Sequence, residues 1–197
     1  MPRQLVAPPA SEPLTLAEAK DHLRVDHDLE DAAILRLIRS AREAAEEATS
    51  RTLLPTTWRL KLERWPAPEL VDGRWIREIR IEDCLLSVGS ISYRDVAGVL
   101  QVLDPSAYQV DEGPPARIRP AYGASWPTAR PGLGAVEVVY TAGYASADLV
   151  PASLMDWMLL HVGTHYENRE GVVPGVSVAE LPDLDGLLAS AQWGGYP

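Results

Sequence analysis

The sequence predicts an α+β protein in which a small helical bundle carries an inserted antiparallel β-sheet or sandwich. Two observations carry this prediction. Apolar residues recur at helical spacing toward both ends of the chain, whereas in the middle they alternate with polar residues at the period of a β-strand. Since neither helical part has a large partner nearby in sequence, we expect the two parts to pack together as one bundle.

The same change of period gives the predicted domain boundaries. The segments are a flexible arm at 1–13, a helical bundle at 14–55 and 142–190, a β insertion at 56–141, and a tail at 191–197.

The first helical part begins with a capping signal. Thr15 is followed three residues later by Glu18, which is the pattern of a capping box. A second, longer amphipathic helix is expected over residues 28–50, with Asp28 as its N-cap. A third is expected over 151–168, where Gly163 would permit a close helix crossing, and a short last helix is expected near 183–189.

The middle of the chain contains six or seven short alternating segments, separated by turn residues. They are centred on 58–62, 76–81, 88–93, 99–103, 108–110, 117–119 and 136–140.

Charge and composition restrict the possible functions. The formal net charge is −10, and residues 1–50 and 151–197 are the acidic parts. Phosphate contacts need clustered Lys and Arg, so general nucleic-acid binding is not expected. Cys84 is the only cysteine, which excludes an intrachain disulfide. With no signal-peptide pattern and no long apolar run, we expect a soluble protein made in the cytoplasm, with no membrane partner.

One possible chemical site is a pair of histidines four residues apart, His161 and His165. This spacing places both on one helix face and is compatible with a metal, but His22, His27 or a carboxylate would have to supply a third ligand. The alternative is that the two rings make local hydrogen bonds. Cys84 follows two acidic residues, which disfavours a reactive thiolate. We find no nucleophile elbow, phosphate loop or dinucleotide fingerprint, and therefore predict no enzyme activity, no cofactor and no metal.

A second alternative function is a β-type module that binds carbohydrate or protein. It would be marked by exposed tryptophans on one sheet face, drawn from Trp58, Trp65, Trp75 and Trp126. The strand segment with Arg74, Arg77 and Arg80 is interpreted as solvated or interfacial, because acidic residues dilute its positive charge.

Several strings, in this order and spacing, resemble the phage head–tail connector family in its branch with a β insertion, which also occurs in prophages and gene transfer agents. They are LTLAEAKDHLRVD at 14–26, DPSAY at 104–108, PAYGASWP at 120–127, VYTAGY at 139–144, and VPAS at 150–153 followed by a helix ending in YENRE.

The resemblance implies a structural adaptor in the neck of a virion or virion-like particle, assembled in the bacterial cytoplasm. It implies a ring, usually of twelve copies, between the portal protein and a stopper, head-closure or tail protein. DNA would pass through the ring without specific binding. In this family the C-terminal segment reaches into the portal, so Trp193 and Tyr196 are the expected portal contacts.

Overall fold

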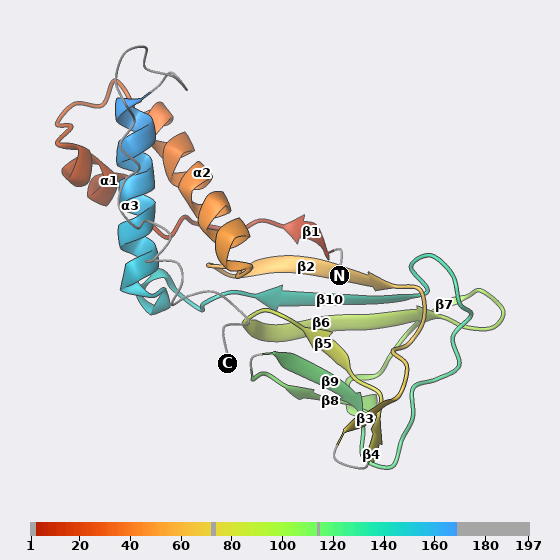
Figure 1. Ribbon diagram of the computed structural model, residues 1–197. Helices are drawn as coiled ribbons and strands as arrows, with labels where there is room; N and C mark the ends of the chain where they lie inside the picture. The colour runs from red at the N-terminus through yellow and green to blue at the C-terminus, as the bar shows by residue number, and fades with distance from the viewer. Residues whose placement is uncertain (1–2, 72–73, 114, 169–197) are drawn as a thin grey trace, which may run out of the picture. The chain divides into compact units, whose positions relative to one another are not determined.

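The computed structural model describes residues 3–71, 74–113 and 115–168, and the chain divides into two compact units (Figure 1). Unit 1 contains residues 1–9 and 55–143, and unit 2 contains residues 10–54 and 144–197. Each unit is described by itself.

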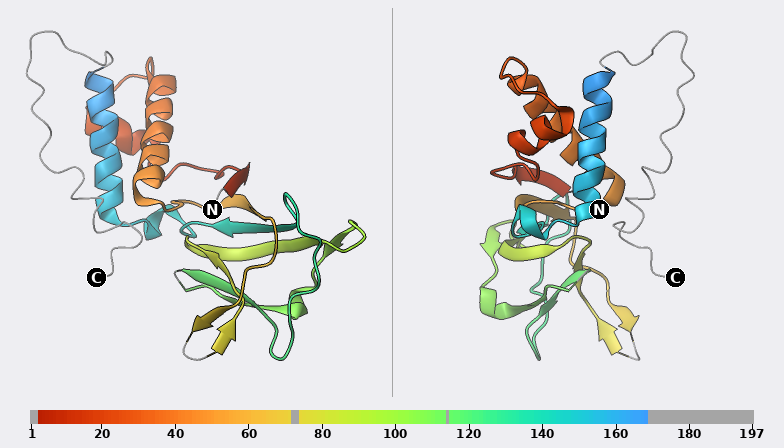
Figure 2. Two further views of the ribbon diagram at one scale, coloured as in Figure 1. Left: turned by 45° about the vertical axis from the view of Figure 1, so that its right-hand side comes forward. Right: turned by 90° about the vertical axis from the view of Figure 1, so that its left-hand side faces the viewer.

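Unit 2 is helical. Its helices are α1 (Leu16–Leu23), α2 (Asp31–Thr49) and α3 (Ala152–Glu167), and a short 3-10 turn, η2 (Ala147–Leu149), precedes α3. Helices α2 and α3 lie side by side, with α1 against them (Figures 1 and 2). None of the described helices is long and apolar enough to cross a membrane.

The starts of α1 and α2 differ in how their backbone donors are satisfied. The predicted capping box of α1 is confirmed, because Thr15 and Glu18 cap each other reciprocally. The prediction that Asp28 caps the second helix is wrong, since α2 begins at Asp31 and its N-cap is Glu30. The Asp28 carboxylate instead accepts a hydrogen bond from Lys20 Nζ at 2.6 Å, which occupies the group that would have capped the helix.

The core of unit 2 is formed by apolar side chains from all three helices. The fully buried ones on the helices are Ala19, Ile34, Ile38, Ala41, Ala45, Leu154, Met158 and Val162. The small side chains of Ala41 and Ala45 on α2 favour a close approach of another helix. Gly163 on α3 faces α1, and a Cβ there would lie 3.4 Å from His22 Nε2, an ordinary contact distance.

A charged side chain is buried at one edge of this core. The Arg42 guanidinium donates to Glu12 and to Glu46, each at 2.7 Å, and the Arg42 side chain is only 8% exposed. The other Glu46 oxygen accepts from the backbone N–H of Leu53 at 2.9 Å. Burial lowers the pKa of Arg42, but Glu46 and Glu12 outweigh it and hold the pKa above its ordinary value.

Unit 1 consists of antiparallel strands. They are β1 (Arg3–Ala7), β2 (Thr56–Leu62), β3 (Glu69–Val71), β4 (Arg74–Ile76), β5 (Ile79–Ile81), β6 (Leu85–Arg94), β7 (Leu100–Val102), β8 (Tyr108–Asp111), β9 (Ala116–Pro120) and β10 (Val136–Ala142), with a 3-10 turn, η1 (Pro105–Ala107), before β8.

These strands form three sheets (Figure 2). The large sheet has the order β1-β2-β10-β6-β7, a second sheet has the order β5-β9-β8, and β3 pairs only with β4. The apolar faces of the large and second sheets share one core, closed by Trp65 and Trp126, whose rings stack 4.5 Å apart. With helices in one unit and antiparallel sheets in the other, the predicted α+β class is confirmed.

The first residues of the chain differ from the prediction of a flexible arm. Residues 3–7 form β1, an edge strand that pairs with β2 from Arg3–Leu60 to Ala7–Thr57. The cause is a buried charge far along the chain: Arg3 Nη1 donates to Asp83 Oδ2 at 2.5 Å, and Asp83 is only 1% exposed. The Arg3 guanidinium also lies 4.2 Å from the centre of the Trp58 ring.

The buried Arg42 network should dominate the stability of unit 2. Arg42→Ala would leave Glu12 and Glu46 without their cation, so the free energy of unfolding should fall by about 3 kcal/mol. Urea denaturation measures this change. Arg39→Ala is the matched control: Arg39 lies 3.7 Å from the same Glu12, but its side chain is 70% exposed. Its loss should cost less than about 1 kcal/mol. Equal losses for both variants would contradict this assignment.

Asp83 should determine whether β1 stays on the sheet. In Asp83→Asn the carboxylate that holds Arg3 is lost, and the amides of residues 3–7 should exchange hydrogen faster than in the wild type. Hydrogen–deuterium exchange with mass spectrometry measures the effect. Glu69→Gln, which removes an exposed ion pair with Arg80, should leave exchange in β1 unchanged. Unaltered protection of β1 in Asp83→Asn would show that strand pairing alone is sufficient.

Candidate interaction surfaces

The predicted histidine pair lies on α3 as a stack of rings. The ring centres of Trp157 and His161 are 4.9 Å apart, and those of His161 and His165 are 4.1 Å apart. His165 Nδ1 donates a hydrogen bond to the backbone oxygen of His161 at 2.9 Å. The histidine rings thus make a local hydrogen bond, which is the alternative to a metal site that the sequence left open. Among the described residues, no group of three metal-ligating side chains comes together.

Cys84 and the basic strand segment are both tied into local structure. The Cys84 N–H donates to Asp83 Oδ1 at 2.9 Å, and the Cys84 carbonyl accepts from Gly143 at 2.8 Å. Arg80 of the basic segment and Arg119 on β9 each donate a hydrogen bond to Glu78 at 2.7 Å. Burial raises the pKa of Glu78, but these two guanidinium groups outweigh it and lower the pKa. Arg80 of this segment is therefore paired within unit 1, with Glu78 and Glu69.

The tryptophans do not form the exposed row that would mark a β-type binding module. Trp65 and Trp126 are buried, and Trp58 is half-buried beneath Arg3. Trp75 on β4 is 72% exposed. It belongs to the β3–β4 hairpin, which we did not predict as a separate element. The Asp72-Gly73 dipeptide, a strong signal for a tight hairpin, could have identified it.

A shallow groove lies in unit 2 between α2 and the end of α3. Its lining residues are Ala33, Arg36, Leu37, Ser40, His165, Tyr166 and Asn168. The Tyr166 hydroxyl donates to Glu30, which fixes one end of the groove. The lining mixes apolar and polar groups and brings together no set of nucleophile, base and oxyanion donor.

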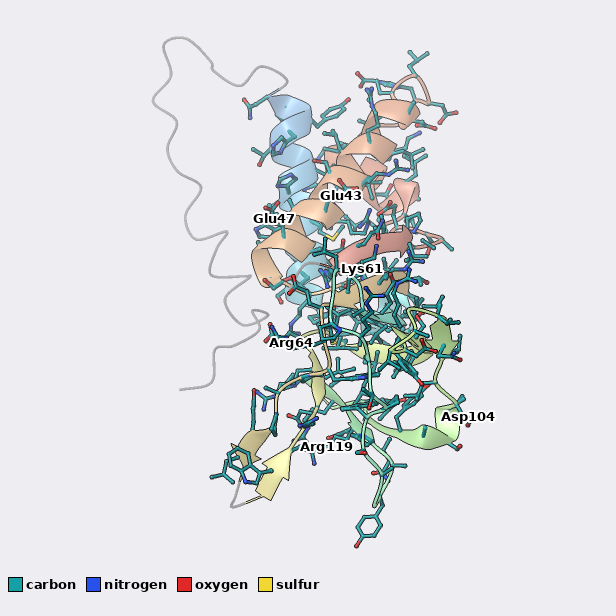
Figure 3. The ribbon with its side chains drawn as sticks, turned by 90° about the vertical axis from the view of Figure 1, so that its right-hand side faces the viewer. Glu43, Glu47, Lys61, Arg64, Asp104 and Arg119 are labelled. Atoms are coloured by element: carbon teal, nitrogen blue, oxygen red, sulfur yellow. The ribbon has the colours of Figure 1, made fainter. Side chains whose placement is uncertain are left out.

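The charge of the chain is divided unequally between the units. Unit 1 contains 11 acidic and 11 basic side chains, whereas unit 2 contains 17 acidic and 7 basic ones. Figure 3 labels two of the acidic side chains of unit 2, Glu43 and Glu47 on α2, and two of the basic side chains of unit 1, Lys61 and Arg64. The whole net charge of −10 therefore belongs to the helical unit.

The predicted portal contacts, Trp193 and Tyr196, lie outside the described residues, as does the expected short helix at 183–189. Their role stays a prediction.

Comparison with known proteins identifies the relatives of the chain. Residues 13–79 match the family described as phage gp6-like head-tail connector protein. No curated protein sequence matches the chain.

Solved structures match over the whole chain. A chain in the neck of an empty gene transfer agent particle, computed with C6 symmetry, is 27% identical, with a TM-score of 0.75. Chains in the virion of a native gene transfer agent particle, and in its neck computed with C12 symmetry, are each 26% identical, with a TM-score of 0.72. All three alignments cover 100% of both chains.

The predicted resemblance to the head–tail connector family is thereby confirmed, and the relatives are structural components of particles. Their sixfold and twelvefold symmetric necks indicate a ring.

The stacked histidines should make the stability of unit 2 depend on pH. Burial and the neighbouring His165 lower the pKa of His161 below its ordinary value of 6.5. The unfolded chain therefore binds a proton at this position more readily than the folded chain does. The contribution of neutral His161 to the free energy of unfolding is fully present above about pH 6.5 and decreases as the pH falls below that value. Unfolding followed between about pH 7.5 and 5.5 should show a smaller decrease for His161→Gln than for the wild type. His27→Gln, at an exposed position, is the control, and equal slopes for all three proteins would contradict the prediction.

Proposed function

We propose that this chain is a non-enzymatic head–tail connector subunit, which forms a ring in the neck of a phage-like or gene-transfer-agent particle. The observation that carries the proposal is the alignment over 100% of both chains with neck proteins at 26–27% identity. A match of this extent includes the helical unit and the β insertion together, and not a single widely shared motif.

The partners that we propose are the portal protein on one side and a stopper, head-closure or tail protein on the other. The C-terminal segment, with Trp193 and Tyr196, would contact the portal. Large aromatic side chains at a chain end are suited to this role, because they bury much area with few rotatable bonds. We also propose that the boundaries predicted from sequence, a bundle at 14–55 and 142–190 around an insertion at 56–141, separate two functional parts.

The acidic unit 2 supports a further part of this proposal, that its acidic side chains face the DNA channel. Its 17 acidic against 7 basic side chains would repel phosphate, so DNA could pass without binding. A ring reconstruction with Lys and Arg lining the channel would contradict this orientation.

Particle assembly tests the proposed function directly. Cells that make the particle but lack this chain should accumulate heads and tails that are not joined, because the ring between them is missing. Electron microscopy counts joined and unjoined particles, and re-expression of the full chain should restore joining. A normal yield of joined particles without the chain would overturn the proposal.

A further inference from the structure

The β3–β4 hairpin is an unusual element of unit 1, because it has no core of its own. Each strand has three residues, and β3 and β4 pair only with each other. An exposed ion pair between Glu69 and Arg80, at 2.9 Å, links the hairpin to β5. A hairpin of this length is marginally stable in water, so a permanent position on the surface needs additional contacts.

The hairpin also carries large apolar side chains on its surface. Leu70 is 60% exposed and Trp75 is 72% exposed. The two residues are direct cross-strand partners, so their side chains lie on the same face of the hairpin. Tryptophan is enriched among the residues that contribute most to the binding energy at the centre of a protein–protein interface.

A second apolar surface lies at the end of the β6–β7 hairpin. Val96, Val99, Leu100 and Val102 are 71%, 55%, 53% and 70% exposed. Strand β7 is an edge of the five-stranded sheet, and residues 96–103 contain no charged side chain. Strand β7 has only three residues, which limits its capacity to pair as an edge strand, but four exposed apolar side chains at this end form a patch of the kind that marks an interaction surface.

The β3–β4 hairpin and strand β7 belong to different sheets of unit 1 and lie apart in it (Figure 1). Two different, complementary surfaces on one chain produce head-to-tail contacts, which close into a ring when the rotation between copies is suitable.

We propose that the Leu70–Trp75 face of the β3–β4 hairpin docks on the uncharged β6–β7 edge of a second copy of this chain. The proposal rests on the ring described under Proposed function and names the surfaces that build it. Trp75 supplies the main apolar anchor, and the open β7 edge supplies the surface that receives it.

Two variants of the full chain test this contact. In the hairpin variant, Leu70→Ala and Trp75→Ala remove the anchor, and in the edge variant, Leu100→Lys and Val102→Lys place charges on the receiving surface. Each alone should weaken ring formation by on the order of tenfold or more. The control is Leu133→Ala with Tyr122→Ala, two loop positions that are 90% and 98% exposed, and it should assemble as the wild type does.

Mixing the two variants distinguishes the proposed contact from a general loss of stability. Each variant keeps one intact surface, so a mixture should form dimers and no larger species, whereas each variant alone stays monomeric. Native mass spectrometry reads the species, and circular dichroism checks that each variant is folded. Where the wild type assembles only on particles, electron microscopy scores rings formed with each single variant.

The outcomes separate this inference from the proposed function. If the wild type forms rings and the hairpin variant forms them equally well, the docking contact is wrong and the connector function stands. If the hairpin variant forms rings that fail to join other neck proteins, Trp75 contacts a different partner and the second-copy assignment is wrong. If particles join normally without the chain, the connector function itself fails.

Discussion

The buried guanidinium of Arg42 is the interaction on which unit 2 most depends. It binds Glu12, which lies just after the chain enters this unit, and Glu46, which in turn accepts from the backbone of Leu53, just before the chain leaves. Tyr144, the first residue after the β segment, donates its backbone N–H to the Leu53 carbonyl at 3.1 Å. The three points at which the chain enters or leaves unit 2 are thus held near the same end of α2.

In unit 1, strand pairing holds together the segments through which the chain enters and leaves the unit. The segments that enter or leave it are β1, β2 and β10, which are neighbours in the large sheet. Thr56 pairs with Ala142 at the end of the β2–β10 ladder, so an insertion of about ninety residues begins and ends at adjacent positions. Such an insertion can grow or change without disturbing the helical packing, because its ends remain together. A bundle and a sheet with separate cores can then carry separate tasks.

Local signals in the sequence were sufficient for most of the elements but not for the contacts between them. The capping box of Thr15 and Glu18 and the alternation around β2 and β10 depend on neighbouring residues, and both were predictable. Arg42 has the spacing of an ordinary surface charge on an amphipathic helix, and only its distant partner Glu12 explains its burial. Strand β1 likewise depends on Asp83, about eighty residues away, so a proline-rich segment that resembles a loose arm becomes an ordered edge strand.

The hairpin β3–β4 was missed for a related reason. Its strands are too short for periodicity to separate them from the next strand, and nothing in the sequence shows that Leu70 and Trp75 share an exposed face. The alternation of apolar and polar residues also could not show that Trp65 and Trp126 form a stacked pair and are not part of an exposed row. Exposure depends on which sheet covers which, and that is a property of the tertiary fold.

The division of charge explains why the contacts of unit 1 matter most for assembly. Unit 2 contains 17 acidic and 7 basic side chains, so neighbouring copies of it repel one another. A closed ring would place these copies beside one another. This repulsion favours the proposal that attraction between copies comes from unit 1, which has no net charge. Unit 1 also exposes apolar side chains on two hairpins. Contacts between apolar side chains do not weaken when salt screens the charges of the protein. The proposed acidic channel and the proposed ring contacts are compatible, because the first would belong to unit 2 and the second to unit 1.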